Sequence, residues 1–580
     1  MANYTGEAVL EKVRELVARS RRVGTNVSLY TGPELGRLAD SVGQRNIFGG
    51  HNWDTRVRNR SAKYTVVLGS EEVAIRNPLP EQVETIAGMD GDFTRIFGGE
   101  FDGKQYRGHA NRLPVDLVHR VMGSGEDPDF TFNCYLMVTT KNRANHHITY
   151  MWGKMCRAVD PAEGAENLYM LMVPDVHTGN FGRFYCFPKQ NVTIGIGSDY
   201  VGEAKKGMLR MAMYEAKGKG ILGIHAGTKI VRALNQSSGE LKYYGVAIFG
   251  NSGTGKTTNV GHTHYLDMKG EQVLVVQDDF SGLRLKDGRI LGTEQAMFLK
   301  TDLDGDDLLL RAATESPEFL SQNLYIDYEG EIRYLEEDLC ANGRGVLPLR
   351  ALPRERRYES LDLPPLEELD NLFILINTRR NTVVPILQEL TPEQCAAYFM
   401  LGESIETAAG DPTKAGQSTR VVGMNEFIVG DPAEDGNIFY EYLKRYESKV
   451  RCFLINSGGV GEIRDPQDPR TLKRPANRPG KNGVGYVTRA LFRNTAVYSD
   501  HPDFGTRVLT AGVYDEKGQI FDMSKFDPRQ LYGAARQRPL AFARFLIPQR
   551  KQHRVPVKNN TTHPYDGMQR IFPSHFIPPV

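Results

Sequence analysis

The sequence predicts a two-lobed α/β protein, with a mixed α+β amino-terminal lobe and a carboxyl-terminal lobe that contains a mononucleotide-binding P-loop. The chain has 580 residues, which exceeds what a single hydrophobic core usually organises. Short apolar runs typical of buried strands recur along it, between longer polar and helical segments. One of these runs leads directly into a glycine-rich loop with phosphate-binding spacing. These observations favour two large domains, or one two-lobed unit with a site in its cleft.

Composition limits the classes of partner that the protein is expected to bind. Lys plus Arg (72) nearly balances Asp plus Glu (71), so no overall field favours nucleic acid or a membrane surface. Mean hydropathy is −0.42, and no apolar run reaches the roughly 18 residues of a membrane span. We therefore expect a small-molecule substrate, no nucleic-acid or membrane partner, and a monomer or small homo-oligomer.

Cysteine usage and the first segment of the chain predict a cytoplasmic location. Residues 5–20 form an amphipathic helical pattern whose glutamates argue against a transit peptide. The cysteines show neither a C-x-x-C pair nor a metal-binding spacing, which is typical of reduced thiols in a cytosolic enzyme. They are Cys134, Cys156, Cys186, Cys340, Cys395 and Cys452.

The first lobe, residues 1–235, combines short strands with polar turns. Residues 63–68, 135–139 and 168–173 are its clearest strands. A further strand over 191–200 runs toward a helix over 208–216.

Two elements of this lobe are candidates for anion or metal chemistry. Lys205 and Lys206 stand together at the predicted strand-to-helix junction, where they form either an anion or metal–phosphate locus or a solvated charged turn. His225 follows the apolar run 221–224, and it is either a metal ligand or a core or surface histidine.

The second lobe, residues 236–580, begins with the phosphate-loop motif. The apolar residues 246–249 lead into a G-x-x-x-x-G-K-[ST] sequence, which predicts a strand feeding a phosphate loop. Glycines let successive N–H groups converge on phosphate oxygens, a lysine adds positive charge, and a threonine hydroxyl can bind Mg²⁺. The alternative is a glycine-rich turn that binds nothing. The nine residues concerned are Gly250, Asn251, Ser252, Gly253, Thr254, Gly255, Lys256, Thr257 and Thr258.

A pair of acids follows the next strand. The apolar residues 273–276 end in Asp278 and Asp279, at the carboxyl end of a strand beside the phosphate loop. The metal partners of a nucleotide belong at this position. The alternative role of the two aspartates is to cap a turn.

The rest of the second lobe alternates strands with longer connections. Further strands are expected over 372–376 and 450–455, and Thr391 with Gln394 predicts a capped helix through Leu401. The loops over 410–423 and 464–485 either close over a polyphosphate or form solvated surface.

Taken in order, these motifs resemble the ATP-using phosphoenolpyruvate carboxykinases. The resemblance covers residues 165–285 and extends more weakly to about 495. The family's phosphate loop, G-L-S-G-T-G-K-T-T, is matched at every position but one. The other matching segments are Y-x-G-E-x-K-K-G at residues 200–207, the histidine of an M-H-C-S-A-like segment at His225, the acidic segment at 277–279, and L-T-P-E-Q at 390–394.

The resemblance implies a metal- and ATP-dependent mechanism. Lys206, His225 and Asp279 would bind a divalent transition metal, for which the family implies Mn²⁺. Lysine binds a metal only when neutral, so Lys206 would need a strongly lowered pKa. Tyr200 and Lys205 would meet the carboxylate substrate or CO₂.

The resemblance also assigns the nucleotide contacts. The phosphate loop would hold the triphosphate of ATP, with Lys256 on the outer phosphates and Thr257 on Mg²⁺. Asp278 would order the metal shell, and Arg489 falls in the segment that faces the adenine. The reaction implied is that of a gluconeogenic lyase, in which oxaloacetate loses CO₂ and the enolate takes the γ phosphate of ATP.

Two arginines of the family lack a full match. Residues 60–64 match a shortened form of the family's R-S-P-K-D-K-Y segment. Arg60, the first of them, is either a carboxylate clamp or a surface residue that opens a strand. The arginine of the family's T-E-R-G segment has no clear counterpart. Lys414 or Arg420 would have to substitute for it.

Three functions remain open on the sequence. The first is an ATP-dependent carboxykinase-like lyase. The second is a kinase of the same fold that phosphorylates another small molecule, because both reactions transfer a γ phosphoryl group. The third is a nucleotide-gated regulatory binding protein, although such a switch does not need a second metal site.

Overall fold

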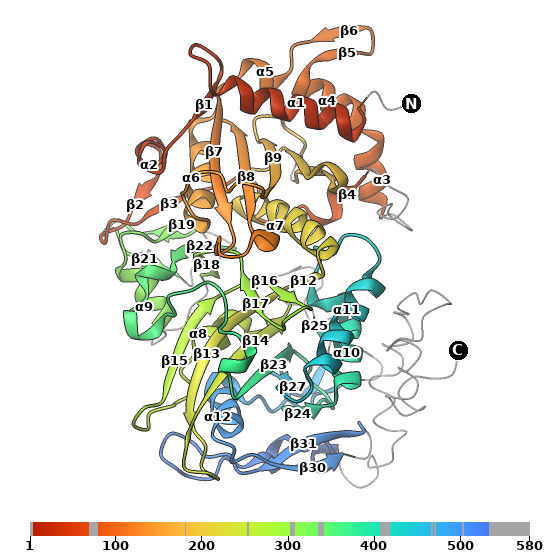
Figure 1. Cartoon of the computed structure of the whole chain (residues 1–580). Coiled ribbons are helices and arrows are strands. Elements are labelled where there is room, and N and C mark those ends of the chain that lie inside the picture. Colours follow the sequence, from red (N-terminus) through yellow and green to blue (C-terminus); the bar gives the residue numbers. More distant parts are fainter. Residues whose placement is uncertain are drawn as a thin grey trace. The chain divides into compact units, whose positions relative to one another are not determined.

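The computed structural model describes residues 4–68, 79–179, 181–251, 254–301, 308–334, 342–405, 418–465, 468, 471–501 and 504–532. The chain forms two compact units that interleave along the sequence (Figure 1). Unit 1 comprises Met1–Gly223, Leu291–Pro353 and Phe427–Asp431, and unit 2 comprises Ile224–Ile290, Arg354–Glu426 and Pro432–Val580. The single boundary predicted near residue 235 is therefore incomplete, since two later segments of the chain belong to unit 1.

A mixed seven-stranded sheet forms the centre of unit 1. Its order is β1-β7-β8-β9-β11-β10-β4, with parallel pairs β1/β7, β8/β9, β9/β11 and β10/β4 and antiparallel pairs β7/β8 and β10/β11. The strands are β1 (Val27–Leu29), β4 (Thr65–Val67), β7 (Val115–Met122), β8 (Phe132–Thr139), β9 (Glu166–Val173), β10 (Arg183–Phe187) and β11 (Val192–Ile196). The strands predicted over 135–139 and 168–173 are therefore confirmed.

Helices cover both faces of this sheet. On one face, α1 (Gly6–Arg19) and α4 (Met89–Phe97) pack their apolar side chains against inward residues of the strands. On the other face lie α6 (His146–Met155) and α7 (Val201–Gly218), which also contact each other. The amphipathic pattern of the first segment is confirmed, since α1 is capped by Thr5 and buries Val9, Leu10, Val13 and Leu16.

Three boundaries in unit 1 differ from the sequence prediction. The strand predicted over 191–200 is shortened to β11 (Val192–Ile196). α7 begins at Val201 rather than near residue 208, so Lys205 and Lys206 lie in its first two turns and not at a junction. The reason is that this first part of the helix is buried, and burial outweighs the polar character of the segment. The predicted strand over 63–68 is shortened to β4, because residues Ala62–Tyr64 form a 3₁₀ turn.

A second sheet in unit 1 explains why a later segment returns there. Its order is β18-β22-β19-β3-β2, and β19 pairs in parallel with β3. The strands are β2 (Gln44–Arg45), β3 (His51–Trp53), β18 (Ala296–Lys300), β19 (Leu320–Gln322) and β22 (Arg344–Pro348). This pairing joins residues 320–322 to 51–53, a link that no local sequence pattern indicates.

Unit 1 also contains several smaller helices and hairpins. They are α2 (Gly32–Asp40), α3 (Pro80–Ala87), α5 (His109–Arg112), α9 (Leu308–Glu315), and the hairpins β5 (Gly99–Phe101) with β6 (Lys104–Tyr106) and β20 (Tyr325–Ile326) with β21 (Ile332–Arg333).

Unit 2 is built on an eight-stranded sheet of order β15-β13-β14-β23-β27-β24-β31-β30. The three central strands β14, β23 and β27 are parallel, and β13 runs antiparallel between β14 and β15. The strands are β13 (Ala226–Leu234), β14 (Leu241–Gly250), β15 (Gln272–Gln277), β23 (Asn371–Thr378), β24 (Leu387–Leu390), β27 (Val450–Asn456), β30 (Val497–His501) and β31 (Thr506–Ala511). All four strands predicted for this lobe are confirmed within β14, β15, β23 and β27.

The helices of unit 2 are α8 (Lys256–Gly261), α10 (Pro392–Leu401), α11 (Pro432–Arg445), α12 (Gly480–Phe492) and α13 (Pro528–Tyr532). The predicted capping box of α10 is present, with Thr391 and Gln394 bonding each other's backbone N–H groups. α10 packs on α11 through Phe399 and Phe439, whose rings stack at 4.4 Å. The remaining strands in the described residues are β12 (Ile221–Ile224), β16 (Ser281–Arg284), β17 (Ile290–Gly292), β25 (Glu403–Ile405), β26 (Ser418–Arg420), β28 (Ile463–Arg464) and β29 (Leu472–Arg474).

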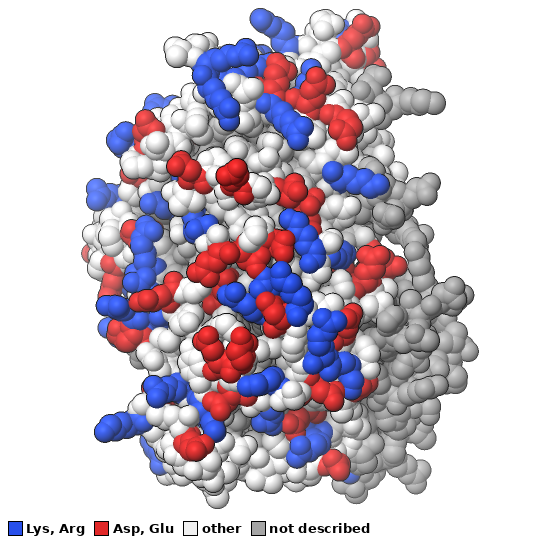
Figure 2. All heavy atoms as spheres, in the orientation of Figure 1, with Lys and Arg blue, Asp and Glu red and all other residues white. Residues whose placement is uncertain are grey.

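Three general expectations concern the cysteines, membrane spans and surface charge. Cys134, Cys156, Cys186, Cys395 and Cys452 are buried free thiols, and Cys340 lies outside the described part. No helix in the described ranges is both long and apolar enough to cross a bilayer. The face drawn in Figure 2 carries Lys and Arg interspersed with Asp and Glu, as the balanced composition predicts.

Candidate nucleotide and metal site

Strand directions in unit 2 bring the predicted site residues to one edge of the sheet. β14 and β15 both run antiparallel to β13, so they run in the same direction and end at the same edge. β13 begins at that edge, directly after His225. The phosphate loop after β14, the acids after β15 and His225 therefore meet, although a single strand separates β14 from β15.

Three side chains make direct contact there. His225 Nε2 lies 2.8 Å from Asp279 Oδ1, and Lys256 Nζ donates to the same oxygen at 2.6 Å. Their exposed fractions are 7% for His225, 7% for Lys256 and 9% for Asp279. Asp279 thus lies between the histidine predicted as a metal ligand and the lysine predicted as a phosphate ligand.

A backbone carbonyl orients the histidine ring. His225 Nδ1 lies 2.8 Å from the carbonyl oxygen of Met424, which can only accept a hydrogen bond. Nδ1 therefore carries a proton, and Nε2 is the nitrogen that faces Asp279. An acceptor of this kind fixes the ring and tautomer of a metal-ligating histidine. Met424 could not be predicted from the sequence, because a main-chain acceptor can belong to any residue type.

The described part of the phosphate loop has the backbone that its glycines permit. Gly255 has φ +89°, a left-handed conformation that favours glycine, and it caps the start of α8. A Cβ on Gly250 would lie 2.4 Å from Thr254 Oγ1, so a larger residue there would have to displace the Thr254 hydroxyl. Ser252 and Gly253 lie outside the described residues.

The loop is also tied to the neighbouring strands. Ser457, just after β27, donates from Oγ to the Thr254 carbonyl at 2.9 Å and lies 3.2 Å from the carbonyl of Thr378 at the end of β23. Ser457 was not among the predicted site residues, and its position after an apolar strand was the only available signal. Its contacts connect the loop to the ends of β23 and β27, the two strands that run parallel to β14.

A glycine on β13 allows the acidic segment to approach. An added Cβ at Gly227 would lie 2.3 Å from the carbonyl oxygen of Asp278 and 2.5 Å from Val260 Cγ2. Real Cβ atoms do not approach backbone so closely, so any larger residue would displace the Asp278–Asp279 segment. Gly227 is therefore a structural requirement of the site.

The donor atoms suit a divalent transition metal. An imidazole nitrogen and a carboxylate oxygen are both suitable ligands, and they converge at His225 and Asp279. In the described ranges no group of three or more His, Cys, Asp or Glu side chains is placed to hold a metal ion. Among these residues a third protein ligand would be of another type, and Lys206, on α7 of unit 1, stays a prediction for that role.

Unit 1 contains the two lysines and the tyrosine predicted for the substrate. Lys205 is wholly buried and donates to Glu294 Oε2 at 2.6 Å, with exposed side-chain fractions of 0% and 2%. This burial argues against direct contact of Lys205 with a substrate carboxylate. The carboxylate of Glu294 also compensates the charge of Lys205, the neighbour of Lys206 in the sequence.

Cationic side chains gather on one aromatic ring in unit 1. The Arg60 guanidinium carbon lies 4.4 Å from the ring centroid of Phe427, Lys206 Nζ lies at 4.7 Å, and Arg210 at 5.6 Å. Lys206 and Arg210 are one turn apart on α7, and such cation–π contacts stabilise positive charge at a buried ring. Arg60 and Lys206 therefore share one aromatic neighbour, and their role in a substrate site stays a prediction.

An arginine that was not predicted from the sequence contacts Tyr200. Arg344, the first residue of β22, donates from Nε to the Tyr200 hydroxyl at 3.0 Å. Within the described part of the chain, neither residue expected to replace the family's T-E-R-G arginine is placed in this way. Arg420 forms a buried ion pair with Glu403 at 3.0 Å in unit 2, and Lys414 lies outside the described residues.

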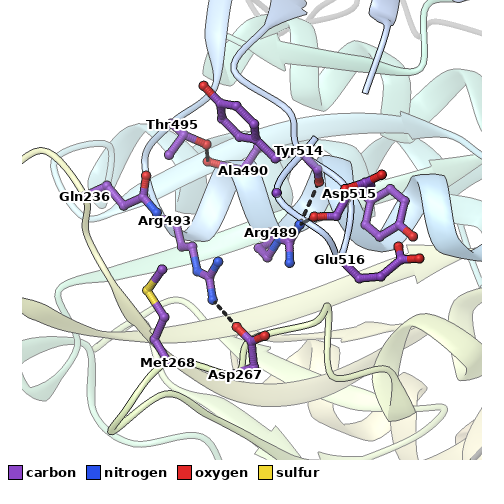
Figure 3. Close-up of a pocket in the computed structure, with 12 residues that line it drawn as sticks. Gln236, Asp267, Met268, Arg489, Ala490, Arg493, Thr495, Tyr514, Asp515 and Glu516 are labelled. Carbon is purple, nitrogen blue, oxygen red and sulfur yellow. Dashed lines mark hydrogen bonds and ion pairs between the residues drawn. The ribbon is translucent and has the colours of Figure 1, made fainter. Parts of the chain in front are cut away.

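Arg489 lies in a pocket of about 370 Å³ in unit 2 (Figure 3). Its guanidinium donates to the carbonyl oxygens of Tyr265, Tyr514 and Asp515. The pocket also includes Gln236, which follows the end of β13, so it extends toward the end of that strand remote from His225. Arg489 as a nucleotide contact stays a prediction.

Fold and site together define an α/β protein of the P-loop nucleotide-binding class. The family model described as phosphoenolpyruvate carboxykinase matches residues 125–473, which is more than half of the chain. The chain therefore belongs to the phosphoenolpyruvate carboxykinase family, and the resemblance inferred from the motifs is confirmed.

Curated relatives carry the name phosphoenolpyruvate carboxykinase (ATP). One from Aeropyrum pernix is 31% identical over 348 residues, covering 60% of this chain and 64% of the relative. One from Parvibaculum lavamentivorans is 24% identical over 334 residues, covering 56% of this chain and 55% of the relative. One from Rhodopseudomonas palustris is 24% identical over 337 residues, with coverages of 56% and 55%. The chain thus spans less than two thirds of the length of these relatives.

Proposed function

We propose that this protein is an ATP-dependent phosphoenolpyruvate carboxykinase-like enzyme. It would decarboxylate oxaloacetate and transfer the γ phosphoryl group of ATP to the enolate, giving phosphoenolpyruvate, ADP and CO₂. The observation that carries the proposal is the contact of Asp279 with both Lys256 and His225 at the edge of the sheet, in a chain of this family. Cytoplasmic location, a gluconeogenic role and a monomer or small homo-oligomer are parts of the same proposal.

The phosphate half of the reaction rests on residues of unit 2. Backbone N–H groups of the loop would bind the phosphates, Lys256 would neutralise charge on the outer ones, and Thr257 would contribute its hydroxyl to Mg²⁺. Asp278 would order the water around that ion. Positioning and charge compensation are the main contributions a protein makes to phosphoryl transfer.

His225 and Asp279, with Lys206 as a proposed third ligand, would hold Mn²⁺. The bound metal supplies Lewis acidity that stabilises negative charge developing on the organic substrate. The protein contributes the orientation of its ligands: the Met424 carbonyl keeps the proton on Nδ1 of His225, and Gly227 keeps the Asp279 backbone in place.

Residues of unit 1 would bind the organic substrate. Tyr200 and Arg344 form one hydrogen-bonded pair, and Arg60 and Lys206 both contact the Phe427 ring. A guanidinium can grip a carboxylate with two parallel hydrogen bonds, so Arg60 and Arg344 are our choices for the substrate carboxylates. Arg344 replaces Lys414 and Arg420 in this role, since Arg420 is already paired with Glu403. Lys205 becomes a positioning residue through its pair with Glu294.

A coupled assay tests the function. Purified protein with Mn²⁺, Mg²⁺, ATP and oxaloacetate is expected to form phosphoenolpyruvate, and to exchange labelled bicarbonate into oxaloacetate. An Arg344→Gln variant should raise the KM for oxaloacetate and leave ATP binding unchanged. If ATP binds but neither phosphoenolpyruvate formation nor exchange occurs, the lyase is contradicted and the search moves to other phosphoryl acceptors.

The metal site has its own prediction. His225→Gln removes an imidazole ligand, so the Mn²⁺ concentration for half-maximal activity should rise, by about 10- to 100-fold on the scale of lost metal-site interactions. The measurement is a Mn²⁺ titration of activity at saturating ATP. His109, a partly exposed histidine whose ring contacts the Arg95 carbonyl in unit 1, offers a matched His→Gln control. An unchanged Mn²⁺ requirement in folded His225→Gln would show that this histidine is not a ligand.

A further inference from the structure

A wholly buried lysine lies behind the phosphate loop, outside the roles assigned so far. Lys229 is in the middle of β13, and its side chain has an exposed fraction of 0%. Within the described part of the chain, its ammonium group contacts polar atoms of only two residues. These are the backbone carbonyl and side-chain oxygen of Asn259, and Nε2 of His264.

The hydrogen-bond directions along this cluster can be assigned. Thr488 donates its hydroxyl proton to the Val484 carbonyl at 2.8 Å, so its oxygen is the acceptor for His264 Nδ1–H at 2.5 Å. With the proton on Nδ1, Nε2 of His264 is the acceptor for Lys229. We call Lys229, Asn259, His264 and Thr488 the anchor chain.

The electrostatic environment shows what it costs to bury this group. Burial, followed by the charge of Arg356, holds the pKa of Lys229 well below its usual value, which means that the surroundings penalise its charged form. Burial, followed by the positive charge of Lys229, holds the pKa of His264 well below 6.5, so the imidazole is neutral and can accept a hydrogen bond. Each of the three N–H groups of the Lys229 ammonium has an acceptor within the anchor chain, and these hydrogen bonds limit the free-energy cost of burying the charge.

The anchor chain ends on the helix that starts with the phosphate-binding lysine. α8 has 6 residues, from Lys256 to Gly261, and Asn259 lies in its last turn. The final carbonyls of a helix lack partners within the helix, and a lysine near them satisfies an acceptor. Lys229 is paired with Val246 of β14 and Val275 of β15, so it is itself fixed by both neighbouring strands. Movement of α8 away from the sheet would break these contacts.

The anchor chain also contacts α12. Thr488 is in the middle of that helix, and His264 also packs edge-on against the ring of Phe492. The position of α8 is therefore tied to the sheet at one end and to α12 at the other. A short helix of this kind has little stability of its own and depends on tertiary contacts for its orientation.

We propose that Lys229, through the anchor chain, is a positioning residue for the phosphate loop, and that it sets the affinity of the site for polyphosphate. The inference rests on the phosphate-binding part of the proposed function and is independent of the organic substrate. Lys229 would not touch the nucleotide, because its amine is occupied by Asn259 and His264. Its effect reaches the phosphates through the orientation of Lys256 and Thr257 at the start of α8.

The test measures binding with two probes. Lys229→Met keeps the length of the side chain and removes its hydrogen bonds. Calorimetric titration with Mg²⁺–ATP and with inorganic tripolyphosphate should show affinity for both falling by about tenfold or more, the scale of a small misplacement of binding groups. Lys242→Met, at the partly exposed start of β14, is the matched control and should bind both probes as the wild type does.

A second variant changes Thr488, at the far end of the anchor chain. Thr488→Val removes the acceptor of His264 and leaves Lys229 in place, and it should weaken tripolyphosphate binding in the same direction, by about threefold, as loss of one hydrogen bond would. Tripolyphosphate has no base, so this result cannot come from an adenine contact. The variant also answers the question if Lys229→Met does not fold.

The outcomes separate the two proposals. Folded variants that have a lower melting temperature but bind both probes as the wild type does would overturn the positioning role. Wild-type protein that binds neither ATP nor tripolyphosphate would instead overturn the nucleotide site, and with it the proposed function.

Discussion

Lys256→Ala is expected to abolish ATP turnover while the protein remains folded. Lys256 opens α8 and its Nζ atom contacts both the side chain and the backbone carbonyl of Asp279. Its removal takes away the mobile positive charge that would meet the outer phosphates, and loss of one such preorganised group costs about 10²- to 10³-fold in rate. The measurement is the rate of ADP formation in the coupled assay, with the melting temperature recorded on the same samples.

A matched lysine gives the control for this variant. Lys269 is an exposed residue of the same unit, in the turn before β15, and Lys269→Ala should leave turnover unchanged. If Lys256→Ala folds and turns over ATP at the wild-type rate, the phosphate-loop assignment fails. The variant should also lose affinity for tripolyphosphate, since the phosphates are its proposed partner.

Gly227→Ala is expected to have the second largest effect, although the substitution adds only a methyl group. The new Cβ would lie 2.3 Å from the Asp278 carbonyl oxygen, which belongs to the backbone and cannot simply rotate away. The segment carrying Asp278 and Asp279 must shift, and Asp279 is the residue that both His225 and Lys256 contact. A displacement of about 1 Å at such groups can cost about 10²-fold in activity.

The metal dependence separates this effect from a general loss of stability. In Gly227→Ala the Mn²⁺ requirement should rise together with the loss of rate, and overpacking should lower stability by about 1–3 kcal/mol. Gly218, in α7, has no heavy atom within 4 Å of the position that a methyl group would take, so Gly218→Ala should change neither. Normal activity in Gly227→Ala would show that the acidic segment does not need its close approach to β13.

The nucleotide half of the site was predictable because its signals are local. The spacing of Gly250, Gly255 and Lys256 follows from the backbone geometry that phosphate binding needs, and Asp279 follows an apolar run that is a strand in the structure. The start of α10 was predictable for the same reason, because Thr391 and Gln394 satisfy each other's backbone groups within four residues.

The extent of α7 shows where local signals fail. Its first two turns contain Lys205 and Lys206, whose charges predicted a polar junction before the helix. In the structure this part of α7 is buried, and Lys205 is paired with Glu294, a residue far along the chain. From sequence alone, a charged residue is predicted to be exposed to solvent unless its ion-pair partner is known. Here that partner is brought close only by the tertiary structure.

The sequence by itself determined the family, the two-lobed α/β class, the phosphate loop and the identities of His225 and Asp279 as candidates. Only the tertiary structure decided that His225 faces Asp279 through Nε2, that Arg344 contacts Tyr200, and that Lys229 stands behind α8. The physical reason is the range of the interactions. Glycine conformations, caps and hydrophobic periodicity act within one turn or strand, whereas strand order, main-chain acceptors and buried charge pairs depend on residues that are brought together only when the chain folds.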